Sequence, residues 1–129
     1  MEKFLAIPAA LVSLGMLSVA LAQAPSVKEL MRTDIIPNSD RLFAIGDTAP
    51  RTPQDWLALQ TSLDALNRSA MRLRSMNANV DWQGYGTTLS KLAAQASTAA
   101  REQNLETLLD IGDKAYETCE GCHKHYLPK

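Results

Sequence analysis

The 129-residue chain has little that would suit it to nucleic acid or to a multidomain architecture. Its 13 basic and 14 acidic residues are mixed along the sequence, and the formal net charge is −1. Without a block of Lys and Arg, nucleic acid is not an expected partner. No low-complexity segment or long linker interrupts the chain, so its length corresponds to one domain. The carboxylates show no paired arrangement suited to acid–base catalysis, so we do not expect an enzyme.

The first 22 residues differ from the rest. Glu2 and Lys3 precede a mostly apolar run that closes in an Ala-x-Ala pattern at Ala22. A charged start, an apolar middle and this ending are the parts of a cleavable secretory signal peptide. We therefore expect a signal peptide over 1–22 and a mature domain over 23–129, located in an oxidising periplasm without stable membrane association. The alternative is a retained membrane anchor, for which the run is long enough.

Apolar residues of the mature domain recur every three or four positions, which is the spacing of amphipathic helices. Ser26 and Glu29 form a capping-box pattern, and Thr52 precedes a proline at a first helical position. Pro37 predicts a kink or short break in the first helix. Short connections between amphipathic helices predict an all-α protein, an antiparallel four-helix bundle. The expected helices span about 27–45, 53–75, 81–101 and 104–126.

Cysteine and histidine are scarce, with two of each, and three of the four lie in Cys119-Glu120-Gly121-Cys122-His123. Cys-x-x-Cys-His is the pattern of covalent c-type haem attachment. Each thiol adds to a haem vinyl group, and the histidine binds the iron. Offsets of three and four positions put the three side chains on one face of the last helix, which predicts a haem inside the bundle. The other members of this predicted core-facing stripe are Leu105, Leu108, Leu109, Gly112, Ala115, Tyr116 and Tyr126.

Cysteines at this spacing also occur in sites that hold no haem. They could form a plain disulfide or a thioredoxin-like redox pair, although the latter is typical of a βαβ context that this sequence does not show. A zinc site would need a further ligand, which His125 could supply. However, His125 is two positions from His123, so we expect it on a different, solvent-facing side of the helix.

A four-helix bundle with Cys-x-x-Cys-His near its C-terminus resembles the class II c-type cytochromes, the cytochrome c-prime family. The resemblance covers the mature chain, and Tyr126 looks like an aromatic residue of that family. It implies one covalent haem c per chain, held by Cys119, Cys122 and His123, with Tyr126 against it. The family often has a basic residue after the aromatic, whereas this chain has Leu127.

The resemblance also implies two forms of the iron centre. In one branch a methionine of the first helix is the sixth ligand, and Met31 is suitably placed to join His123 as a metal ligand. Such ligation raises the haem potential and suits electron transfer. In the other branch an apolar residue, here Leu30, covers an open iron that binds NO or CO. From spacing alone, Met31 is a core methionine.

The expected function is therefore that of a periplasmic monohaem cytochrome that carries single electrons between redox proteins through Fe(II)/Fe(III). The alternative is a five-coordinate, gas-binding cytochrome c-prime. Apolar residues on the outer faces of the first two helices permit a homodimer. Trp56 and Trp82 are expected to anchor the core. The sequence also contains a cluster of three arginines. We expect these side chains to lie on a solvated helix face and not to contact haem propionates or an acidic partner. This cluster comprises Arg68, Arg72 and Arg74.

Overall fold

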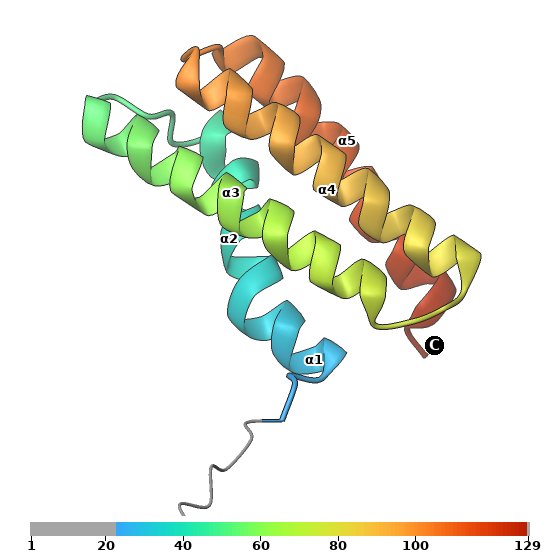
Figure 1. The fold of residues 1–129 in the computed structure, drawn as a ribbon. Coiled ribbons are helices and arrows are strands. Elements are labelled where there is room, and N and C mark those ends of the chain that lie inside the picture. The colour runs from blue at the N-terminus through green and yellow to red at the C-terminus, as the bar shows by residue number, and fades with distance from the viewer. Residues whose placement is uncertain (1–22, 129) are drawn as a thin grey trace, which may run out of the picture.

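The computed structural model describes residues 23–128, which fold into helices joined by short connections (Figure 1). The first helical segment is composite, and three long helices follow it, packed antiparallel. This arrangement confirms the predicted all-α, antiparallel four-helix bundle, whereas the predicted signal peptide lies outside the described residues. No helix within residues 23–128 is both long and apolar enough to span a bilayer. The elements are α1 (Val27–Leu30), a π-helical turn η1 (Met31–Ile35), α2 (Ile36–Phe43), a 3₁₀ turn η2 (Ala44–Gly46), α3 (Pro53–Ser75), α4 (Val80–Arg101) and α5 (Leu105–Tyr126).

Side-chain caps begin each of the four helical segments. The Ser26 hydroxyl accepts from the Glu29 N–H while the Glu29 carboxylate accepts from the Ser26 N–H, which is the predicted capping box. Thr52 caps α3 in the same way with Asp55. The backbone N–H of Arg51, followed by that of Thr52, holds the pKa of the Asp55 carboxyl below its usual value. Asparagines cap the other two helices, Asn79 on α4 and Asn104 on α5.

The first helical segment widens at η1 and continues through Pro37. The Ile36 N–H donates to the carbonyl of Met31, five residues earlier, as a π-helical turn requires. Pro37 has no N–H to donate to Thr33, and its ring crowds that carbonyl, so a wider turn just before the proline relieves the clash. The structure therefore has a π-helical turn where the sequence predicted a kink or short break.

The core is built from leucines of every helical segment and from alanines of α4. Leu30, Leu63, Leu66 and Leu108 are fully buried. Small residues let α4 approach α3 closely, and hydroxyls link the two helices: Ser97 donates to Asp64, and Ser90 donates to Asn67. Trp82 is buried and its indole N–H donates to the Leu73 carbonyl at 2.7 Å, while Trp56 packs on the core edge. Both tryptophans are core anchors, as predicted. The buried alanines of α4 are Ala93, Ala96, Ala99 and Ala100.

A close approach of α4 to α3 depends on Gly86. A Cβ added to Gly86 would lie 2.7 Å from Arg74 Cβ and 2.8 Å from Arg74 Cα, whereas a Cβ added to Gly84 would meet nothing within 4 Å. The sequence placed both glycines in a helix without indicating that they differ. Only Gly86 is required by packing.

We expect Gly86→Ala to destabilise the protein by about 1–3 kcal/mol, because the Arg74 backbone must move to admit the methyl group. Gly84→Ala is the matched control and should stabilise the protein by about 0.5–1 kcal/mol through helix propensity. Urea unfolding of the two variants measures both changes. Equal stabilisation by the two substitutions would contradict this close crossing.

Candidate functional site

The first helical segment and α5 meet at one end and diverge toward the other. At the closed end a Cβ added to Gly112 would lie 3.8 Å from the Leu42 side chain, and α5 contacts both α2 and η2. Among the described residues, no Cα atom of α1 or η1 lies within 8 Å of a Cα atom of α5. A cavity of about 380 Å³ lies between the diverging helices, and α3 and α4 also contribute to its walls.

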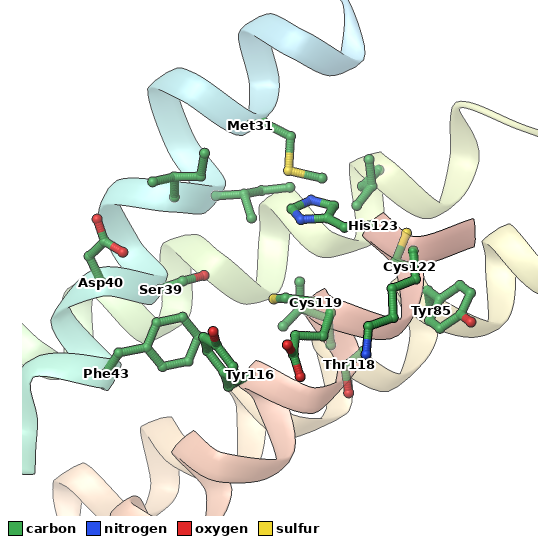
Figure 2. A pocket seen from close by; sticks show the side chains of 16 residues that line it. Met31, Ser39, Asp40, Phe43, Tyr85, Tyr116, Thr118, Cys119, Cys122 and His123 are labelled. Carbon is green, nitrogen blue, oxygen red and sulfur yellow. The ribbon is translucent and has the colours of Figure 1, made fainter. Parts of the chain in front are cut away.

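Four of the residues that the sequence singled out line this cavity together. Met31 comes from η1, and Cys119, Cys122 and His123 come from the last turns of α5. Figure 2 shows the Met31 thioether and the His123 imidazole extending toward each other from opposite walls. Residues 88 to 92 positions apart in the sequence are thus brought to one site. The arrangement places a soft sulfur donor opposite an imidazole, with two thiols beside them.

The remaining walls are largely apolar. The sequence indicated that residues such as Tyr116 lie on apolar helix faces, but it did not group them at one site. Their rings and aliphatic side chains come from all four helical segments, so no single periodic pattern groups them. The rings of Phe43 and Tyr116, both labelled in Figure 2, pack edge to face with their centroids 5.7 Å apart. Exposed Asp40, Glu120 and Lys124 also border the cavity. The apolar wall residues are Ile35, Ile36, Phe43, Leu73, Tyr85, Leu89 and Tyr116.

Leu30 and Tyr126 lie elsewhere. Leu30 is fully buried in the core and is not among the residues that line the cavity. The Tyr126 hydroxyl donates to Asn79 Oδ1 at 2.8 Å, and its ring packs edge to face on Trp82 with centroids 5.0 Å apart. Tyr126 therefore ties the end of α5 to the α3–α4 connection. The tyrosines that line the cavity are Tyr85 and Tyr116, and the ring centroid of Tyr85 is 6.4 Å from that of Tyr126.

The predicted stripe on α5 is wider than the face that the core buries. Leu108, Gly112 and Ala115 are buried, but Leu109 and Tyr116 are 42% and 55% exposed. Leu105 and His123 are exposed as well. The cavity is therefore open to solvent beside the histidine, and the predicted position of a haem inside the bundle stays a prediction.

The other predicted polar groups lie where the sequence indicated. His125 is exposed, and its ring lies 4.6 Å from that of Tyr126 between centroids. Arg68, Arg72 and Arg74 are exposed along α3 and do not line the cavity. Within residues 23–128 no group of three or more His, Cys, Asp or Glu side chains could hold a metal ion.

The two thiols are free, and their helical setting opposes a disulfide. Cys119 and Cys122 are one turn apart in α5, which continues to Tyr126. Cβ atoms at this spacing are about 5–6 Å apart, whereas a disulfide needs about 3.5–4.5 Å. Closing the bond would distort the helix. Burial raises the pKa of both thiols, and the neighbouring Cys122 adds to the effect on Cys119. Thiols of redox enzymes have lowered pKa values instead.

Taken together, the fold and this cavity define a small, all-helical, four-helix protein with a thiol- and imidazole-lined cleft between its first and last helical segments. Comparisons with protein-family models, with curated proteins and with solved structures found no match to this chain.

The raised thiol pKa values predict slow alkylation of the haem-free protein. The pH midpoint of alkylation by iodoacetamide should lie above the ordinary thiol value of 9.0 in the folded protein and return to it in urea. Because the unfolded chain releases these protons first, the folding stability should fall as the pH rises above 9.0. A midpoint below the ordinary value would instead indicate an activated redox pair.

Proposed function

We propose that this protein is an exported monohaem c-type cytochrome that carries single electrons. The observation that supports this most strongly is the meeting of Met31, Cys119, Cys122 and His123 at one cavity. The Cys-x-x-Cys-His pattern supports the same assignment independently, because it is the attachment pattern of haem c.

The residues present fit a haem. Two free thiols one helical turn apart can each add to a vinyl group to form a thioether, and an imidazole lies one position beyond the second thiol. The cavity between the helices is lined mainly by rings and aliphatic side chains, which suits a flat apolar macrocycle. A buried hydroxyl at Ser39 and the Lys124 ammonium at the border offer partners for carboxylate groups.

Each residue has a separate role in this proposal. Cys119 and Cys122 would hold the group by thioether bonds that do not dissociate, and His123 would be the proximal ligand. Met31 would be the distal ligand, held in place by η1. π-Helical turns of this kind occur frequently at functional sites. Haem c supplies a one-electron Fe(II)/Fe(III) couple, and histidine–methionine ligation raises its potential.

Electron transfer accounts for this arrangement better than catalysis does. Ligands from both walls would leave no iron position for a substrate, so we propose a carrier and not an enzyme. The solvent-open side at His123 would place the redox group near the surface, where a redox protein can approach. Together with the predicted signal peptide, this function corresponds to a periplasmic location. Exposed Ile36 and Leu57 are the apolar side chains that a homodimer would bury.

Expression of the full chain beside the haem-attachment machinery tests covalent loading. We expect a red, secreted protein whose mass exceeds that of the mature polypeptide by one haem. Acid–acetone extraction should not remove this haem from the protein. The double variant Cys119→Ala, Cys122→Ala should lose the added mass. A colourless protein with the bare polypeptide mass would contradict the proposal.

The distal ligand is tested by Met31→Ala, with Met71→Ala as the matched control because Met71 is 54% exposed on α3. In the reduced state we expect the parent and Met71→Ala to have low-spin spectra that CO does not change. Met31→Ala should become high-spin and bind CO, because it lacks the thioether. If the parent is already high-spin and binds CO, the five-coordinate gas-binding function replaces electron transfer.

A further inference from the structure

Ser39 carries a polar group that the fold leaves without a partner. Its side chain on α2 is 4% exposed, and its hydroxyl oxygen is the one buried side-chain polar atom within residues 23–128 that makes no hydrogen bond. Figure 2 shows this hydroxyl directed into the cavity. Leaving a buried hydroxyl unpaired is costly, and native proteins rarely do so. An acceptor supplied by whatever fills the cavity would satisfy it.

The position of Ser39 along the wall restricts what that acceptor can be. Met31, Ile35 and Ser39 follow one another at intervals of four residues and all line the cavity. At 1.5 Å per residue, Ser39 lies roughly 12 Å along the helix from Met31, and somewhat less because η1 is π-helical. A small ligand on an iron beside Met31 could not span this separation. A substituent at the edge of the porphyrin could.

The chemistry of the haem edge then selects one kind of group. This step rests on the haem proposed above. The methyl groups and the two thioether-linked side chains are poor acceptors, so the two propionates are the remaining groups. Of the charged side chains at the cavity border, Lys124 would attract a carboxylate and Asp40 and Glu120 would repel it. All three are exposed, where water and salt screen their charge, so the buried Ser39 hydroxyl is the partner that the cavity wall itself offers. We propose that the Ser39 hydroxyl donates a hydrogen bond to a haem propionate.

The test uses the haem-loaded full chain with Ser39→Ala, which removes the donor, and Ser39→Thr, which keeps it. In resonance Raman spectra we expect the propionate bending band to shift in Ser39→Ala and to stay near its original frequency in Ser39→Thr. The reduction potential should fall in Ser39→Ala only, because an unpaired propionate carries more negative charge toward the iron and favours Fe(III). A role in packing alone would not move the propionate band in this pattern.

Three results would overturn the assignment. One is an unchanged propionate band in Ser39→Ala. Another is that Ser39→Ala, introduced into the Met31→Ala variant, shifts the Fe–CO stretch but not the propionate band. That result would place the hydroxyl beside the iron ligand. The third applies even if the variants do not load: a crystal structure of the haem-loaded parent in which Ser39 Oγ has no propionate oxygen within about 3.0 Å. A parent chain with no haem spectrum would instead defeat the proposed function itself.

Discussion

The structure depends on how the first helical segment packs against α5. The two are in close contact at α2 and η2 and diverge toward η1 and α1. Gly112 lets α5 lie against Leu42, and Gly46 lies near Leu109 at the same end, with 3.9 Å between the Cβ site and a methyl group. From there the two helical segments diverge, so that Met31 and His123 line opposite walls of a cavity. Had a large side chain replaced Gly112, the angle between the helices and the width of the cavity would both change.

The other two long helices provide the rigid frame for this divergence. The α3–α4 pair packs closely through Gly86, buried alanines and two interhelical hydrogen bonds, and the Trp82 indole N–H fixes the end of α3. Tyr126 attaches the end of α5 to the same region through Asn79. The last turns of α5, which carry the thiols and the imidazole, are therefore held from one side only. Their other side is free to face the cavity.

The sequence predicted those features that depend on local chemistry. Caps at Ser26 and Thr52 and the three-and-four spacing of leucines located the helices, because these signals act within one or two turns. The spacing of Cys119, Cys122 and His123 placed them on a shared face for the same reason. Met31 was singled out only through resemblance to a family. Ser39 and Tyr85 were missed, since their place on the cavity wall depends on how separate helices pack.

Two further differences have the same origin. Periodicity marks the direction of a buried face but not its width, so Leu109 and Tyr116 were assigned to a core that does not cover them. Pro37 signalled a local irregularity in the first helix, but whether a helix breaks or widens depends on what holds its two ends. Here Leu30 is packed in the core before the turn and Leu42 after it, and the helix widens at η1.

The central proposal is that Met31 and His123 would bind one haem from opposite faces. The most direct measurement is a proton NMR spectrum of the reduced, haem-loaded protein. A methionine bound to diamagnetic iron places its methyl group over the porphyrin ring, where the ring current moves the resonance far upfield. The account predicts one such three-proton signal, assignable to Met31. A haem-loaded protein with no upfield methyl signal, or with one assigned to a different methionine, would contradict it.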